Sequence, residues 1–203
     1  LELKSSIQGM GLNQRIYSTR FIDDKAYVVT YRETDPFHVI DLSGEPSLEG
    51  KLKLEGYSSY LHPLSEDRIL GVGMTNDSVK LTVFDVSEGQ PEVSSSETLN
   101  ESYSVALNNH HAFLIDKRHE SFFLPASNGG YIYSYSEGLE EVKKIDIENP
   151  QRATYIGDTM YVFSDRKAIA VSQENWETVK RVDFGAERNM VYYPEPIPRD
   201  LPR

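Results

Sequence analysis

Short stretches in which apolar and polar residues alternate recur along this chain, and turn-forming residues separate them. A period of two predicts β-strands, because successive side chains of a strand point to opposite faces of a sheet. Few windows place apolar residues three and four positions apart, as an amphipathic helix requires. The pattern therefore predicts an all-β protein.

The predicted strands fall into units of four, each about forty residues long, which is the period of a propeller blade. The phrase VIDLS at residues 39–43 returns as VFDVS at 83–87, at the matching place in the next unit. Residues 1–185 are thus expected to form a β-propeller of four-stranded antiparallel blades. The four blades are expected to start near residues 15, 57, 110 and 152, with the first strand of the third blade at 110–116.

Both ends of the chain depart from this repeat. Residues 1–8 alternate imperfectly and are expected to add one extra strand before the first blade. From residue 186 onward the alternation is lost, and four prolines between 194 and 202 favour an extended tail at 186–203.

Charge and cysteine content narrow the classes of partner and site. Lys and Arg number 21 against 32 Asp and Glu, and the net charge of −11 disfavours nucleic acid and anionic membranes as partners. No window reaches the about 18 apolar residues of a membrane-spanning helix. The chain has no cysteine, which excludes disulfides and thiolate metal sites.

The order of several motifs resembles a known family. RFIDDKAYVVTYRETDPFHVIDL is followed by LKLEGYSSYLHP, LGVG, VKLTVFDVS, LNNHHAF and YIGDTMYVFSD, between about residues 15 and 165. This series resembles the secreted β-propeller domain family of archaea and bacteria, described as distantly related to WD40 repeats. The resemblance implies an extracellular or cell-surface propeller of which these residues form the C-terminal part. It implies no catalytic residues.

In a propeller of this kind, the loops that lead into the first strand of each blade share one face with the loops between the second and third strands. Loops on a rigid scaffold are the usual place for binding residues. The candidates on this face are Asp35, Tyr57, Ser58, His110, His111 and Arg152.

His110 and His111 are the candidates for a metal, because imidazole binds zinc, copper, iron and nickel. A third ligand is expected from Asp35 or Asp77 of neighbouring blades. Adjacent residues of a strand point to opposite faces, so both histidines reach one ion only where the backbone turns. The alternative is that one imidazole bonds between blades and the other is solvated. The acidic turns lack the dense carboxylates of a calcium loop.

Classical catalytic signatures are absent from the sequence: it has no G-x-S-x-G, H-E-x-x-H or phosphate-binding G-x-x-x-x-G-K motif. His62 is a candidate general base, with the alternative that it ends a strand and bonds a backbone carbonyl. Asp41 and Asp85 occupy the same place in the two echoed phrases, which favours turn capping over catalysis. Two glycosylation sequons begin at Asn76 and Asn100, both in predicted loops.

These observations favour a non-catalytic extracellular propeller that binds a protein, peptide or glycan, or serves as a scaffold, without a cofactor. The alternative is a metal-dependent or Ser/His hydrolase with its site on the channel face and a divalent metal at the histidine pair. Four blades can close into a small ring. If they do not, their exposed apolar faces are expected to pair with missing blades of a longer ring or with a second copy of the chain.

Overall fold

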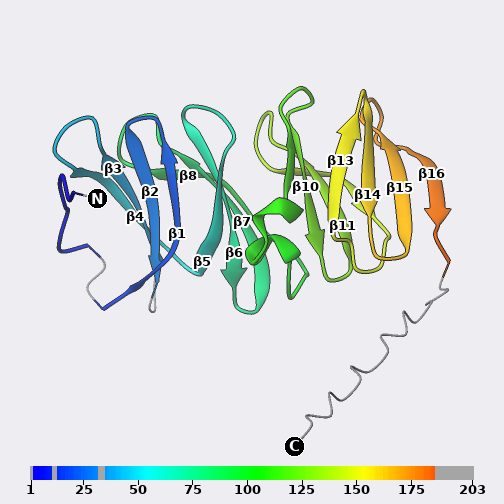
Figure 1. The fold of residues 1–203 in the computed structure, drawn as a ribbon, viewed down its shortest axis with the longest axis horizontal. Coiled ribbons are helices and arrows are strands. Elements are labelled where there is room, and N and C mark those ends of the chain that lie inside the picture. Colours follow the sequence, from blue (N-terminus) through cyan, green and yellow to red (C-terminus); the bar gives the residue numbers. More distant parts are fainter. Residues whose placement is uncertain (1, 11–12, 32–34, 186–203) are drawn as a thin grey trace, which may run out of the picture.

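The structure is a computed structural model that describes residues 2–10, 13–31 and 35–185. Within these ranges the chain forms four antiparallel sheets, each of four consecutive strands (Figure 1). The first blade consists of β1 (Arg15–Ile22), β2 (Lys25–Tyr31), β3 (Asp35–Asp41) and β4 (Ser47–Leu54). The second consists of β5 (Tyr57–Pro63), β6 (Arg68–Thr75), β7 (Ser78–Asp85) and β8 (Glu92–Thr98).

Two short 3-10 helices, η1 (Val105–Leu107) and η2 (His110–Ala112), connect the second blade to the third. The third blade consists of β9 (Leu114–Asp116), β10 (Ser121–Ala126), β11 (Gly129–Ser134) and β12 (Glu140–Ile145). The fourth consists of β13 (Arg152–Ile156), β14 (Thr159–Phe163), β15 (Lys167–Ser172) and β16 (Thr178–Asp183). The all-β fold and its four-stranded blades are as the sequence predicted. The predicted tail at 186–203 lies outside the described residues.

Turn chemistry connects the strands as their residue types predict. Asn76 and Asp77 both have positive φ, 45° and 62°, between the paired residues Thr75 and Ser78. Short Asx side chains tolerate this left-handed backbone, which suits two-residue hairpin turns. The predicted capping role of Asp41 is confirmed, since its carboxylate accepts from the backbone N–H of Ser43 at 2.8 Å.

The core lies between the blades. Between the first two blades, Phe37 of β3 and Phe84 of β7 stack with ring centroids 4.1 Å apart, and both side chains are fully buried. A second cluster joins the middle blades, and a third joins the last two, where Phe123 and Ile132 meet Met160. In the second and third strands of each blade, alternate residues thus pack against a neighbouring blade, as strand periodicity requires.

The four blades stand in an open row. Figure 1 places the first blade at one end and the fourth blade at the other, and β1 packs against β5 of the next blade. The first strands of successive blades therefore run along one side of the row. The described part of the chain contains no helix of the length and hydropathy needed to span a membrane.

Two predicted strands are wrong. Residues 2–8 form no strand, and Ile7 and Met10 instead pack on Ala26, Val28 and Ile40 at the outer face of the first blade. A segment without a neighbouring strand edge has no ladder hydrogen bonds to make.

The strand predicted at 110–116 begins only at Leu114, because η2 occupies its first residues. Asn109 caps this helix by accepting from the backbone N–H of His111 at 3.1 Å. Such local side-chain bonds compete with strand pairing.

A buried carboxylate fastens the third blade to the fourth. Asp116 is fully buried and accepts from Arg118 at 2.9 Å and from Gln173, beyond β15, at 2.9 Å. His119 Nδ1 lies 3.0 Å from the same carboxylate. Burial alone would raise the pKa of Asp116, but these bonds hold it well below its ordinary value.

A second buried carboxylate, Glu101, lies in the chain between the second and third blades. It accepts from the backbone N–H of Asn128 at 2.9 Å, from the Tyr131 hydroxyl and from Lys144 at 3.2 Å. Burial opposes ionisation here too, yet these donors lower the pKa of Glu101. The connection that carries η1 and η2 is thereby tied to the third blade.

Candidate functional site

Two β-bulges lie at matching places in β1 and β5, the first strands of the first two blades. Tyr17 is the unpaired residue of the bulge in β1, and Ser59 is the unpaired residue of the bulge in β5. The hydroxyl of Ser18 donates to the backbone carbonyl of Ser58 at 3.0 Å and ties the two bulged segments together. Bulges change the direction of a side chain and are enriched near functional sites.

Both bulge residues line one open cleft, which we call the tyrosine cleft. Its volume is about 420 Å³, and its lining residues are Tyr17, Tyr57, Ser59, Met74, Tyr103, Leu107 and Asn108. The rings of Tyr17 and Tyr57 lie 4.9 Å apart at an interplanar angle of 53°. The cleft therefore sits at the edge of the first two blades, beside η1.

Tyr103 lies in the connection between the second and third blades, and hydrogen bonds hold it in place. Its backbone carbonyl accepts from the backbone N–H of Ser127 at 3.0 Å and from the hydroxyl of the same serine at 3.1 Å. Its own hydroxyl accepts from the side-chain amide of Asn108 at 3.2 Å. Ser104 caps η1 and donates to the Pro125 carbonyl at 2.6 Å. The loop side of the cleft is thus ordered by hydrogen bonds.

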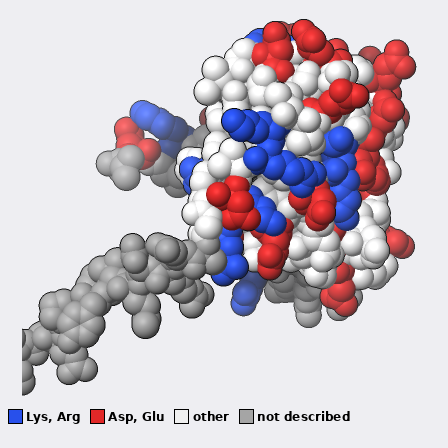
Figure 2. Space-filling model, turned by 90° about the vertical axis from the view of Figure 1, so that its right-hand side faces the viewer, with Lys and Arg blue, Asp and Glu red and all other residues white. Residues whose placement is uncertain are grey.

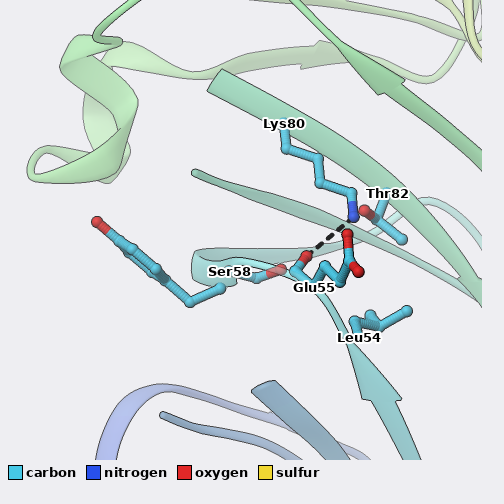
Figure 3. Close-up of a pocket in the computed structure, with 6 residues that line it drawn as sticks. Leu54, Glu55, Ser58, Lys80 and Thr82 are labelled. Atoms are coloured by element: carbon cyan, nitrogen blue, oxygen red, sulfur yellow. Dashed lines mark hydrogen bonds between the residues drawn. The ribbon is translucent and has the colours of Figure 1, made fainter. Parts of the chain in front are cut away.

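A second, smaller hollow shares Tyr57 with the cleft, and its other lining residues are Leu54, Glu55, Ser58, Lys80 and Thr82 (Figure 3). Lys80 donates to the backbone carbonyl of Glu55 across it at 3.0 Å. Ser58 lines this hollow and its side chain is buried, so this candidate lies inside the blade. Ser59, the next residue, takes the place in the tyrosine cleft.

The other sequence candidates lie along the same edge of the blades. Asp35 begins β3 and pairs with Leu54, the residue that ends β4, while Arg152 begins β13 and is exposed. His110 and His111 are exposed on η2, which contacts β13. The structure brings Tyr57 into the tyrosine cleft. The histidines and Arg152 lie outside the cleft, where the third and fourth blades begin.

The histidine pair satisfies one condition for shared metal binding, because the backbone turns at η2 and the two rings lie 4.0 Å apart. The side chain of Asp35, one of the two carboxylates expected to complete the site, lies outside the described part of the structure. Among the side chains that the structure describes, no group of three or more His, Asp and Glu could hold a metal ion.

His62 lies away from the histidine pair, on β5, the first strand of the second blade. Its Nδ1 is 2.7 Å from the hydroxyl of Tyr60, so the bond to a backbone carbonyl expected from the sequence is replaced by one to a side chain. Burial, with the positive charges of Arg20 and Lys117, lowers the pKa of His62 to about 4. The imidazole is therefore neutral near pH 7, and Tyr60 can donate to it.

The sequence prediction missed Tyr17, Tyr103 and Asn108. The signal for Tyr103 and Asn108 was their place in the long connection between the second and third units, which is longer than the hairpin turns. Tyr17 carries no such signal, since it lies inside a predicted strand. Only the pairing register of β1 with β2 shows that Tyr17 is a bulge residue.

Two relatives share clear sequence similarity with the chain. An uncharacterized protein of Archaeoglobus fulgidus is 44% identical over 182 residues, which cover 88% of this chain and 29% of that protein. An uncharacterized protein of Methanocaldococcus jannaschii is 37% identical over 190 residues, which cover 91% of this chain and 30% of that protein. The chain thus spans about three tenths of the length of these relatives.

Solved structures and a family model agree on the architecture. The chain is similar to apo AztD from Citrobacter koseri, with a TM-score of 0.55, 14% identity, and coverage of 83% of this chain and 46% of AztD. A second AztD structure gives the same TM-score at 13% identity. The family model described as the beta propeller domain matches residues 1–176. With the four blades described above, this match shows that the chain belongs to the beta propeller domain family.

Proposed function

We propose that this chain is a non-catalytic binding module and that its ligand occupies the tyrosine cleft. The observation that carries the proposal is the pair of matching bulges that directs Tyr17 and Ser59 into one cleft. Two irregular strands cost ladder hydrogen bonds, and a shared binding surface is a reason for keeping both.

The cleft has the size and the rigidity of a ligand site. Its volume of about 420 Å³ lies within the range of roughly 300–1,000 Å³ that is usual for small-ligand pockets. One wall belongs to β1 and β5, and the other carries Tyr103, whose backbone and hydroxyl are both hydrogen-bonded. A preformed site loses little conformational entropy on binding.

A thermal-shift screen of peptides and glycans tests this function. A ligand that binds only the folded chain raises its stability, by about 2.7 kcal/mol when its concentration is a hundred times its Kd. Tyr17→Ala and Tyr103→Ala are expected to remove the shift. Phe184→Ala is the matched control, because Phe184 is an aromatic residue with 58% exposure at the other end of the row. A shift that survives both cleft variants would contradict the proposal.

We further propose that blades of a longer ring cover the two ends of the row. At the outer face of the fourth blade, Ile156 is 71% exposed and Val182 is 41% exposed. A groove of about 680 Å³ remains at the outer face of the first blade, beside Ala26 and Val28. The relatives are more than three times as long as the part that this chain matches, so they have residues for such blades.

Figure 2 shows the end of the row that the fourth blade forms. A band of Lys and Arg crosses this end, while Asp and Glu gather along its upper and right margins and a few lie beside the band. Exposed cations of this blade are Arg152, Arg166, Lys167, Lys180 and Arg181. An adjoining blade with acidic side chains would complement this band.

Sedimentation of the isolated chain tests whether further blades or a second copy of the chain cover these ends. Self-association that is lost in Ile156→Lys would favour a second copy over further blades. A monomer that binds a separately produced fragment of the longer gene product, again in an Ile156-dependent way, would support further blades.

We also propose an extracellular or cell-surface location. Both sequons support it, because Asn76 lies at the tip of the β6–β7 hairpin and Asn100 in the loop after β8, and both side chains are exposed. Mass spectrometry of the protein from its native source tests this location. A cytosolic protein without modification at either asparagine would contradict it.

A further inference from the structure

The lining of the tyrosine cleft is neutral. Charged residues make up 26% of the chain, yet all seven lining residues are uncharged: Tyr17, Tyr57, Ser59, Met74, Tyr103, Leu107 and Asn108. In the adjoining hollow, the Lys80 ammonium is already bonded to the Glu55 carbonyl. A charged ligand would lose hydration here without gaining a countercharge, so the cleft favours a neutral one.

The polar groups that the cleft offers to a ligand are uncharged and can both donate and accept. Tyrosine hydroxyls do both, and the Asn108 amide carries a donor and an acceptor. Sugar hydroxyls have the same double capacity and can be matched in either direction. The bond from Asn108 to the Tyr103 hydroxyl, at 3.2 Å, leaves that hydroxyl its own proton to donate.

The aromatic groups offer apolar faces beside these hydroxyls. Tyr17 and Tyr103 are 42% and 41% exposed, so each ring has surface available to a ligand. The face of an aromatic ring is electron-rich and attracts C–H groups of positive partial charge. A pyranose ring presents such C–H groups on its faces and hydroxyls around its edge, which is the arrangement that tyrosines with hydroxyl and amide neighbours can recognise.

We infer that the tyrosine cleft binds a neutral sugar ring of an oligosaccharide. This inference rests on the proposed binding function and specifies its ligand class. In this arrangement the exposed face of Tyr103 or Tyr17 stacks on the sugar, while the exposed Asn108 amide bonds its hydroxyls. Uncharged peptides are the competing ligand class, and acidic oligosaccharides are disfavoured by the neutral lining and by the net charge of −11.

Isothermal titration calorimetry tests the inference with three sets of probes. The first contains neutral hexasaccharides of glucose, mannose and N-acetylglucosamine. The second contains oligosaccharides of uronic acids, and the third contains uncharged peptides of similar size. Tyr103→Ala removes the ring, Tyr103→Phe removes only the hydroxyl, and Phe184→Ala is the control. Circular dichroism establishes that each variant is folded.

A neutral hexasaccharide is expected to bind the wild-type chain and the Phe184→Ala control alike. Tyr103→Ala should weaken it about tenfold or more, and Tyr103→Phe by a smaller factor of about three. Binding of peptides or uronic acid oligosaccharides alone, with the same dependence on Tyr103, would overturn the sugar inference and leave the binding function intact. Binding of no probe, or binding that the cleft variants leave unchanged, would overturn both.

Discussion

Lowering the pH should destabilise the fold through His62, and Asn at this position should remove that effect. The ring of His62 lies among Tyr60 and Phe113, with ring centroids 5.9 and 5.0 Å away, and its pKa is lowered from 6.5 to about 4. In the unfolded chain the ring takes up a proton below pH 6.5, whereas in the folded chain it does so only below pH 4. The free energy of unfolding therefore falls as the pH falls through this window.

The magnitude follows from the two pKa values. At pH 5 the unfolded chain is almost fully protonated at His62 and the folded chain is mostly neutral, so the loss is about 2 kcal/mol relative to pH 7. Below pH 4 the loss reaches about 3 kcal/mol and stops growing. Carboxylates with lowered pKa values, such as Asp116, lose their contribution at lower pH.

Urea unfolding at pH 7 and pH 5 measures this loss in wild type and in His62→Asn. Asparagine keeps an acceptor for the Tyr60 hydroxyl and cannot be protonated in this range. The loss of unfolding free energy between the two pH values is expected to be about 2 kcal/mol smaller in the variant. His38, whose pKa is also lowered by burial, contributes equally to both proteins and cancels.

The control for this comparison is His110→Asn, which changes an exposed histidine on η2 and should leave the wild-type difference intact. Equal losses in wild type and His62→Asn would refute the reasoning, because they would mean that His62 accepts its proton in the folded chain without cost. A loss that appears only below pH 4 would assign the effect to carboxylates instead.

Three further predictions concern stability and are measured by urea unfolding at pH 7. Phe37→Ala should cost about 4 kcal/mol because it empties a fully buried contact between the first two blades, whereas Phe21→Ala, on an exposed ring, should stay within about 0.5 kcal/mol; equal costs would contradict the packing. Gly73→Ala should cost about 3 kcal/mol, since its Cβ would overlap a backbone carbonyl of β5, while Gly44→Ala meets open space and serves as control. Asp116→Asn should cost about 2 kcal/mol, because a neutral amide weakens the charge-assisted hydrogen bonds from Arg118 and Gln173, and an unchanged midpoint would show that Asp116 does not fasten the last two blades together.

The parts of the fold that the sequence predicted depend on local chemistry. Asp41 and Asp85 were expected to cap turns, and each accepts from the backbone N–H of a serine two residues later, at 2.8 and 2.9 Å. Asn76 and Asp77 form the tight turn that their side chains favour. Strand alternation repeats in every blade and the turn of Asp41 returns at Asp85, so the sequence carries these signals more than once.

The tyrosine cleft depends on pairing between distant residues, and for that reason only Tyr57 of its lining was predicted. Tyr17 faces the cleft because β1 carries a bulge against β2, and the register of a strand pair is not visible in either strand alone. Tyr103 reaches the cleft because its backbone carbonyl is bound by Ser127, which lies in the next blade. Neither fact follows from the residues nearby in sequence.

The wrong predictions have a similar cause. Residues 2–8 alternate as a strand does, but within the described part of the chain they pair with no strand, and Ile7 packs on the first blade instead. His110 and His111 directly precede an apolar run that suits a strand, yet the Asn109 cap turns the backbone into η2. Alternation shows that a strand is compatible with a segment, and pairing decides whether the strand forms.

Because the clusters that join neighbouring blades are shared by two sheets, a blade is a unit of sequence but not a unit of folding free energy. Stability resides in three successive interfaces, as in a one-dimensional chain of nearest neighbours. A middle blade is held from both sides, whereas the fourth blade is held from one and ends in β16, whose residues are all exposed. Backbone amides should therefore exchange fastest in the fourth blade and slowest where the second and third blades meet, with local opening that proceeds inward from the last sheet.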